Sequence, residues 1–336
     1  MQRLTTTRRV ALCLTVLNEA GNLDLLFASA AAQSRLPDEI VVVDGGSTDG
    51  TVRVIAAWQA RGSPITLLTA PGANISAGRN LAISHADAEI VAVTDAGVRL
   101  DRGWLAALMA PFEVAGDVSP PDVVAGFFQS DPRSPFETAL GATTLPAVQE
   151  IRPERFYPSS RSVAFTRQAW QQAGGYPEWL DYCEDLLFDF ALEDEGFRRA
   201  WAPEAVVHFR PRSSARAFFM QYYRYARGDG KADLWRTRHL IRYATYLGVP
   251  LGIVGARRFP WLLAPTMLAA ALYLRRPYLR LWPGLDVLSQ QERFAALAWV
   301  PIIRLLGDVA KMLGYPVGLI WRLRHRDAIP ADHPRR

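Results

Sequence analysis

Short apolar runs alternate with amphipathic segments along the first part of the chain. The runs at residues 10–17, 39–43, 65–69 and 89–94 are rich in β-branched and aliphatic residues and end in turn residues. Such runs are typical of the buried strands of a parallel sheet. The segments between them carry apolar residues at helical spacing. Strands that alternate with helices predict an α/β fold with a mostly parallel sheet flanked by helices.

The most informative run is residues 39–51, in which a buried strand leads into Asp44. In open α/β sheets, ligands bind at the carboxyl ends of the strands. Gly45 and Gly46 follow Asp44, and without a Cβ they let a flat ring or a phosphate approach the backbone. Asp44 is therefore predicted to accept a hydrogen bond from a nucleotide base; the alternative is that it only begins the strand-to-helix turn. The glycine spacing excludes the dinucleotide fingerprint and the P-loop.

Acidic residues stand at two further element ends. Asp95 follows the strand at 89–94, and Glu184 and Asp185 open a helix after the turn at residues 174–177. A carboxylate at a helix N-terminus is kept ionised by the backbone N–H groups there. Asp185 is thus a candidate general base, and the alternative is a solvated acidic helix start.

The order of these motifs resembles that of the family 2 glycosyltransferases, which are inverting enzymes of the GT-A fold that use nucleotide-sugar donors. The resemblance covers residues 8–232, and its strength lies in the combination, since each motif alone is weak. The segments that carry it are 15–19 (TVLNE), 44–51 (DGGSTDGT), 72–80, 90–95, 184–185 and 221–225 (QYYRY), the last a variant of Q-x-x-R-W with Tyr225 in the place of the tryptophan.

The resemblance also implies roles for individual residues. Asp185 matches the catalytic base, with Glu184 as its acidic neighbour. The residues implied to bind the nucleotide-sugar are Asn18, Glu19, Asp44, Arg79, Asp95, Gln221, Arg224 and Tyr225. Ser159, Ser160 and Arg161 are placed along the donor-sugar pocket.

The metal-binding element of the family is present in altered form. Asp95 matches the first aspartate of D-x-D, which touches the ribose and helps to hold a divalent cation, Mg²⁺ or Mn²⁺. Gly97 stands where the second aspartate belongs. Two ways to offset the charge on the leaving diphosphate stay open: a cation held by Asp95, or the guanidinium groups of Arg79 and Arg224.

Charge divides the chain into two parts. Residues 1–207 hold 16 Lys and Arg against 26 Asp and Glu, net −10, whereas residues 208–336 hold 22 against 7, net +15. The basic part contains two uncharged apolar stretches, 243–256 and 259–274, which are shorter than the roughly 20 residues of a membrane-spanning helix. Re-entrant or in-plane helices fit them better. Residues 294–321, with arginines after them, are typical of an interfacial amphipathic helix.

These observations predict a GT-A glycosyltransferase domain at residues 1–235 and a membrane-associated helical region at 236–336. The two cysteines, Cys13 and Cys183, give neither a disulfide framework nor metal-ligand spacing. Residues 1–9 are polar, and the apolar run after them is too short for a signal peptide, so we expect the N-terminus to stay in the cytoplasm.

The predicted function is inverting transfer of a sugar from a nucleotide-sugar to a lipid-linked or envelope-glycan acceptor at the cytoplasmic membrane face. The predicted partners are therefore the donor, the acceptor and membrane lipids. Nucleic acid is not expected, because the arginines bracket apolar stretches instead of lying along one polar face. The alternative function is that of a catalytically silent, membrane-bound nucleotide-binding or scaffold protein.

Overall fold

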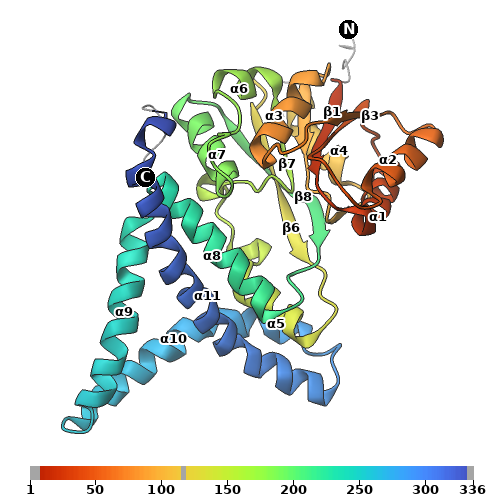
Figure 1. Ribbon diagram of the computed structural model, residues 1–336. Coiled ribbons are helices and arrows are strands. Elements are labelled where there is room, and N and C mark those ends of the chain that lie inside the picture. Colours follow the sequence, from red (N-terminus) through yellow and green to blue (C-terminus); the bar gives the residue numbers. More distant parts are fainter. Residues whose placement is uncertain (1–7, 115–118, 331–336) are drawn as a thin grey trace. The chain divides into compact units, whose positions relative to one another are not determined.

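The computed structural model describes residues 8–114 and 119–330, so the first seven residues of the polar N-terminal segment lie outside the described part. Packing divides the chain into two compact units (Figure 1). Among the described residues, the sheet unit contains 8–129 and 148–209, and the helical unit contains 130–147 and 210–330. The division by packing falls after Phe209, whereas the predicted glycosyltransferase domain extends to residue 235.

In the described residues, the sheet unit is built on eight strands in the order β3-β2-β1-β4-β7-β6-β8-β5. The β3-β2-β1-β4 half pairs in parallel, whereas the pairs β4–β7, β6–β7 and β5–β8 are antiparallel. The expected parallel pairing is thus present in the first four strands along the sheet, which are joined by helices that make the necessary crossovers. The strands are β1 Val10–Val16, β2 Glu39–Asp44, β3 Ile65–Thr69, β4 Ile90–Val93, β5 Val98–Leu100, β6 Val123–Ser130, β7 Val163–Thr166 and β8 Arg199–Phe209.

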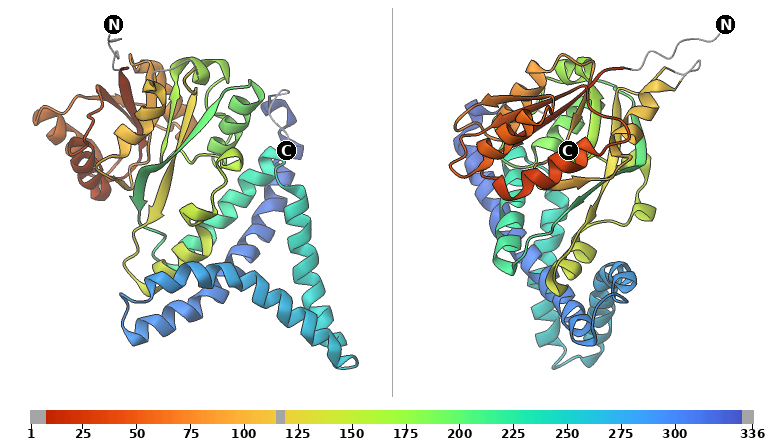
Figure 2. Two further views of the ribbon diagram at one scale, coloured as in Figure 1. Left: turned by 180° about the vertical axis from the view of Figure 1, so that it is seen from behind. Right: turned by 90° about the vertical axis from the view of Figure 1, so that its right-hand side faces the viewer.

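Helices cover both faces of this sheet (Figures 1 and 2). Successive residues of a strand point to opposite faces, so Leu12 and Leu14 of β1 pack toward α1, α2 and α4, while Ala11 and Cys13 pack toward α3, α6 and α7. Helices α3 and α7 therefore share one face of the sheet. The helices of this unit are α1 Ala20–Ala31, α2 Thr51–Ala60, α3 Ile75–His85, α4 Trp104–Met109, α6 Arg167–Gln172 and α7 Glu184–Asp194.

The α-helices of the helical unit are α5 Pro135–Thr144, α8 Ala215–Ala232, α9 Arg236–Gly255, α10 Leu263–Leu281 and α11 Gln290–Arg324. The two predicted apolar stretches form most of α9 and α10. Helix α9 begins earlier, at Arg236, and α10 continues further, to Leu281, and both extensions carry arginines. In the part of the chain that the structure describes, none of the helices combines the length and the apolar character that crossing a membrane requires.

Helices α8 and α11 approach each other closely through glycines. A Cβ at Gly318 would overlap the carbonyl oxygen of Arg227, and one at Gly314 would overlap that of Tyr223. Backbone carbonyls cannot move aside as a flexible side chain can. The contact between the two helices therefore requires the absence of side chains at these positions.

We expect Gly318→Ala to lower the free energy of unfolding of the helical unit by about 1–3 kcal/mol, the usual cost of overpacking. Urea or thermal unfolding followed by circular dichroism measures it. The matched control is Gly248→Ala in α9, where an added Cβ meets no atom within 4 Å. Alanine is favoured over glycine in a helix by about 1 kcal/mol, so the control should be neutral or stabilising. Equal effects of the two substitutions would contradict the close packing.

Candidate active site

Asp44 lies at the carboxyl end of β2 and is buried, with 2% of its surface exposed. Its Oδ2 accepts hydrogen bonds from the backbone N–H groups of Gly46 at 3.1 Å and Ser47 at 3.0 Å. The carboxylate thus closes the turn between β2 and α2, which is the structural role that the sequence left as an alternative. Its contact with a nucleotide base stays a prediction.

Asn18 and Glu19 join the turn after β1 to the turn after β2. The Asn18 N–H donates to Ser47 Oγ at 2.8 Å, and the Asn18 side-chain oxygen accepts from the Thr48 N–H at 2.9 Å. The backbone of Asn18 is in the left-handed region, with φ +56°, which residues other than glycine rarely adopt. The Glu19 N–H donates to Thr51 Oγ1 at 2.9 Å. These contacts hold the predicted nucleotide-side residues in one rim at the carboxyl edge of the sheet.

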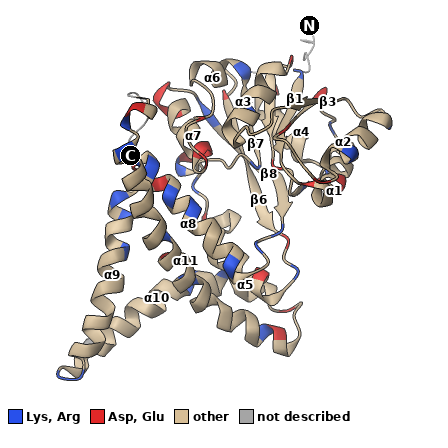
Figure 3. Cartoon of the chain, in the orientation of Figure 1, with Lys and Arg blue, Asp and Glu red and all other residues tan. Residues whose placement is uncertain are grey.

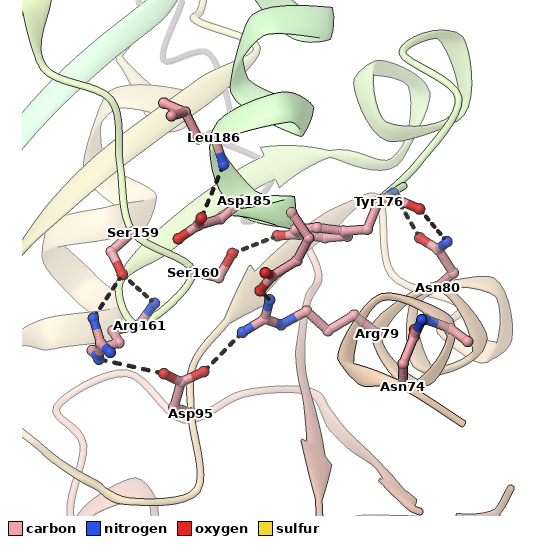
Figure 4. Close-up of polar contacts among 12 residues, drawn as sticks. Asn74, Arg79, Asn80, Asp95, Ser159, Ser160, Arg161, Tyr176, Asp185 and Leu186 are labelled. Carbon is pink, nitrogen blue, oxygen red and sulfur yellow. Dashed lines mark hydrogen bonds and ion pairs between the residues drawn. The ribbon is translucent and has the colours of Figure 1, made fainter. Parts of the chain in front are cut away.

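Arg79 connects the end of β4 with the start of α7. Its Nη2 is 2.8 Å from Asp95 Oδ1 and its Nη1 is 2.7 Å from Glu184 Oε1, although the side chain is only 3% exposed (Figure 4). Helix α3 positions it, because Gly78 lies against β1, where a Cβ would stand 2.5 Å from Thr15 Oγ1. The two carboxylates raise the pKa of Arg79 against the effect of its burial. The guanidinium therefore remains charged.

A second guanidinium approaches the same aspartate. Arg161 Nε lies 3.4 Å from Asp95 Oδ2, its Nη1 donates to Ser159 Oγ at 3.2 Å, and its guanidinium lies over the ring of Phe209 (Figure 4). Both oxygens of Asp95 are thus in ion pairs. The sequence placed Arg161 along the sugar pocket and did not foresee this pair.

The acids at the start of α7 lie in different surroundings. Glu184 is buried, and the burial, with the charge of Asp185 beside it, raises its pKa to about 7 despite the opposing Arg79. Asp185 is more exposed, and its Oδ1 accepts from the Leu186 N–H at 2.9 Å. Cys183 before them has φ +66°. Adjacent acids held in unlike environments are a common basis for dividing acid and base roles.

The sequence did not single out Asn80 and Asn74, which hold the segment before α7. Asn80 Oδ1 accepts from the Tyr176 N–H at 2.9 Å, its Nδ2 donates to the Tyr176 carbonyl at 2.8 Å, and Asn74 Nδ2 donates to the Glu178 carbonyl at 2.6 Å (Figure 4). Tyr176 in turn lies with its ring beneath the Arg79 guanidinium and its hydroxyl 3.0 Å from Ser160 Oγ. Asn80 is the last residue of the 72–80 motif. Its place in that motif was the feature of the sequence that could have identified it as a site residue.

The donor set limits how a metal ion can bind. Among residues 8–114 and 119–330, no three or more His, Cys, Asp or Glu side chains form a group that could hold one. Asp95 offers a carboxylate whose two oxygens already pair with guanidinium groups, and Gly97 offers no ligand. This set fits a cation that arrives with a diphosphate, since Mg²⁺ commonly binds through one or two carboxylates plus phosphates. It does not fit a cation held by the protein alone.

The remaining predicted residues lie on α8 in the helical unit. Gln221 Nε2 donates to the Tyr225 hydroxyl at 2.9 Å, one helical turn away, and Arg224 is exposed on the same helix. The structure thus brings together the rim residues Asn18, Glu19 and Asp44, and separately the cluster of Arg79, Asp95, Glu184 and Asp185. The roles of the three α8 residues stay predictions.

Comparison with known proteins shows what the sheet unit is similar to. The model of "Glycosyl transferase family 2" matches residues 11–165. The chain is 23% identical over 205 residues to the O-antigen chain rhamnosyltransferase RfbN of Salmonella typhimurium, covering 57% of this chain and 63% of that protein. It is 25% identical over 246 residues to the succinoglycan biosynthesis protein ExoA of Rhizobium meliloti, covering 64% of this chain and 67% of ExoA. The chain thus spans less than two thirds of the length of RfbN.

Solved structures show the same fold. The mannosyltransferase PcManGT of Pyrobaculum calidifontis, in complex with GDP-mannose and Mn²⁺, is similar with a TM-score of 0.54 and 20% identity, covering 95% of this chain and 88% of that one. GalNAc-T7 with UDP, GalNAc and Mn²⁺ is similar with a TM-score of 0.50 and 13% identity, covering 67% and 48%. The prediction of a GT-A α/β fold is confirmed.

The raised pKa of Glu184 predicts a pH-dependent stability. Protonated Glu184 contributes to the free energy of unfolding. This contribution is fully present below the ordinary glutamate pKa of 4.5 and is lost as the pH rises through about 7. Glu184→Gln does not ionise, so the free energy of unfolding of the wild type minus that of the variant should fall by up to about 3 kcal/mol between about pH 5 and about pH 8. Urea unfolding at both pH values measures this difference. Glu195→Gln, exposed at the end of α7, is the control, and parallel pH profiles for the wild type and Glu184→Gln would contradict the assignment.

Proposed function

We propose that this chain, which matches the model of glycosyltransferase family 2 over residues 11–165, is a member of that family and transfers a sugar with inversion from a nucleotide-sugar donor to a glycan or lipid-linked acceptor. The observation that supports it most is the cluster in which Arg79 joins Asp95 to Glu184 beside Asp185. This cluster lies at the sheet edge where nucleotides bind in α/β folds. It also contains Asp185, which forms no ion pair with Arg79. A silent scaffold has no need of this arrangement.

In the proposed reaction, Asp185 takes the proton of the acceptor hydroxyl as its oxygen attacks the anomeric carbon of the donor sugar. The new glycosidic bond forms while the bond from that carbon to the diphosphate oxygen breaks, and the electron pair leaves with the nucleoside diphosphate. Attack opposite the leaving group inverts the anomeric centre. An ionised carboxylate within reach of the hydroxyl contributes about 10²–10⁴-fold to the rate.

The leaving diphosphate carries negative charge that has to be offset. Arg161 is a quarter exposed beside Asp95, so it is the guanidinium of the cluster that a ligand can approach, whereas Arg79 is buried. A divalent cation bound with the donor, with Asp95 as the one carboxylate ligand from the chain, would supply further charge neutralisation. The two solved structures of similar fold each contain Mn²⁺ together with a nucleotide or nucleotide-sugar, which supports a cation as part of the donor complex.

The relatives also suggest the kind of acceptor. RfbN is named for the O-antigen chain and ExoA for succinoglycan, and both are polysaccharides. An acceptor sugar on a growing glycan, carried by a lipid or free, fits this proposal.

The helical unit supports action at the cytoplasmic face of a membrane. Large apolar side chains of α9 and α10 are exposed, among them Leu251 at 73% and Met267 at 70%. Exposed arginines lie beside them, including Arg257 and Arg258 at the turn that joins the two helices (Figure 3). Apolar side chains flanked by basic ones match a surface of acyl chains and anionic head groups. We therefore propose an anionic bilayer as the partner of the α9–α10 hairpin.

Asp185→Asn tests the transfer reaction. Release of nucleoside diphosphate from a panel of UDP-, GDP- and dTDP-sugars, in Mg²⁺, Mn²⁺ or EDTA, should fall about 10²–10⁴-fold because the base is lost. The thermal shift produced by the same donor should stay, because that residue is placed on the acceptor side. Asp194→Asn, exposed at the end of α7, is the control. Absence of donor turnover by the wild type under every condition would overturn the proposal.

Co-sedimentation with vesicles tests the membrane partner. The wild type should bind phosphatidylcholine vesicles that contain phosphatidylglycerol, and Arg257→Glu/Arg258→Glu should weaken this binding at least tenfold, since each basic residue near an anionic surface contributes about 1 kcal/mol. Arg53→Glu/Arg61→Glu makes the same charge change at exposed positions of the sheet unit and serves as the control. Equal binding by both variants, or equal binding to vesicles without phosphatidylglycerol, would contradict the proposed surface.

A further inference from the structure

A pocket in the sheet unit is lined by residues other than those of the candidate active site. Its volume is about 460 Å³, within the range of roughly 300–1,000 Å³ that is common for small-molecule sites. It is lined by residues of α7, of the starts of β6 and β8, and of the segments around residues 153–154 and 197. None of the predicted site residues lines it. We call it the α7 pocket.

A buried acid in the α7 pocket lacks a hydrogen-bond partner. Asp189 is 5% exposed, and its Oδ2 has no partner among the residues that the structure describes. Buried side-chain oxygens are nearly always satisfied by protein, water or ligand, so the pocket has an unmet polar requirement. Burial and the charge of Asp185, one turn earlier, raise the pKa of Asp189 well above its usual range. In the protonated form it can both donate and accept a hydrogen bond.

The other lining residues combine aromatic surface with fixed polar groups. Trp201 is held edge-on by Phe156, with ring centroids 4.7 Å apart. Tyr157 supports two polar residues at once: its hydroxyl donates to Glu193 Oε2 at 2.7 Å, and the Arg199 guanidinium lies over its ring at 4.8 Å. The pocket therefore offers a large aromatic residue together with acids and one arginine.

This chemistry discriminates between ligand classes. Three acids, Glu154, Asp189 and Glu193, stand against one basic residue, Arg199, so the pocket disfavours a phosphate or another anion. A wholly apolar ligand would bury these polar groups without partners, which is costly. A sugar ring suits both the aromatic and the polar residues of the pocket. Its C–H face packs against an aromatic side chain, and its hydroxyls donate to carboxylates and accept from a guanidinium.

We propose that the α7 pocket binds a neutral saccharide unit packed against Trp201 and hydrogen-bonded by Asp189, Glu193 and Arg199. Such a unit would be a sugar of the acceptor glycan that does not react; this connection, unlike the binding itself, rests on the proposed function. Asp185 and Asp189 lie four residues apart and so on the same side of α7. A glycan held in the pocket is thereby tied to the helix that carries the proposed base.

Saturation-transfer NMR on the full chain tests the pocket without any donor. The probes are four neutral methyl glycosides, of glucose, galactose, mannose and rhamnose, with glucuronate and inorganic phosphate as anionic comparisons. We expect at least one neutral glycoside to bind and the anions not to bind. Asp189→Leu and Trp201→Leu should each weaken binding at least tenfold, and Trp261→Leu, at an exposed tryptophan of the helical unit, should leave it unchanged.

Thermal unfolding of the variants separates loss of the ligand from loss of the fold. Asp189→Leu removes a buried oxygen without a partner, so its melting temperature should equal or exceed that of the wild type. Absence of binding by all four glycosides, binding unaffected by Asp189→Leu, or displacement of the glycoside by UDP or GDP would each overturn the proposal. Glycoside binding without sugar transfer from any donor would leave the pocket standing and refute the proposed transferase alone.

Discussion

The sheet unit depends on a buried positive charge that has to be neutralised. Taking a guanidinium out of water costs several kcal/mol unless paired carboxylates accept its hydrogen bonds. Arg79 finds these carboxylates on Asp95, just after β4, and on Glu184, at the first residue of α7. The chain between these two acids includes β5, β6, β7 and α6, and all of it has to fold so that they meet on one side chain. The ion pair of Glu184 also places the next residue, Asp185, beside Arg79 without pairing it with that side chain. The position of the α7 start therefore both neutralises Arg79 and supplies the proposed base.

The local features of this arrangement could be predicted from the sequence, and the long-range pairings could not. Apolar runs that end in Asp44 and near Asp95 predict acids at the carboxyl edge of the sheet, because strand period and turn residues are properties of neighbouring positions. The pairing of Arg161 with Asp95 joins residues 66 positions apart, and nothing in either segment encodes it. The antiparallel half of the sheet was missed for the same reason. Which strand lies beside β7 is decided by packing, and short strands such as β5 carry too few residues to show a period.

The helical unit shows a different limit of sequence patterns. The apolar stretches of α9 and α10 were read as short because arginines bound them. Helix α9 begins before its stretch, at Arg236, and α10 continues through Arg275 and Arg276 to Leu281, whereas Arg257 and Arg258 lie in the turn between the two helices. The structure shows which partners the polar groups of these helices have inside the helical unit. Asp308 of α11 accepts hydrogen bonds from Arg242 Nε at 2.8 Å and from the Tyr246 hydroxyl at 3.0 Å, and the Tyr273 hydroxyl also donates to it. Polar groups thus meet in the interior while leucines and methionines face outward, which inverts the usual distribution of a protein in water. That inversion is the physical basis for assigning a lipid surface to these helices.

Helix α7 shows how one element can present acids of opposite character. Its first turn carries Glu184 and Asp185, where unpaired backbone N–H groups and the helix dipole favour negative charge, an effect that fades beyond the first turn. Asp189 lies past that turn, is buried, and faces the charge of Asp185, so both its surroundings and its neighbour oppose ionisation. A negative charge on one acid of this face raises the free energy needed to ionise the next acid. The charge of Asp185 therefore helps to keep Asp189 neutral. The helix can consequently place a proton acceptor at its tip and a hydrogen-bond donor one turn below.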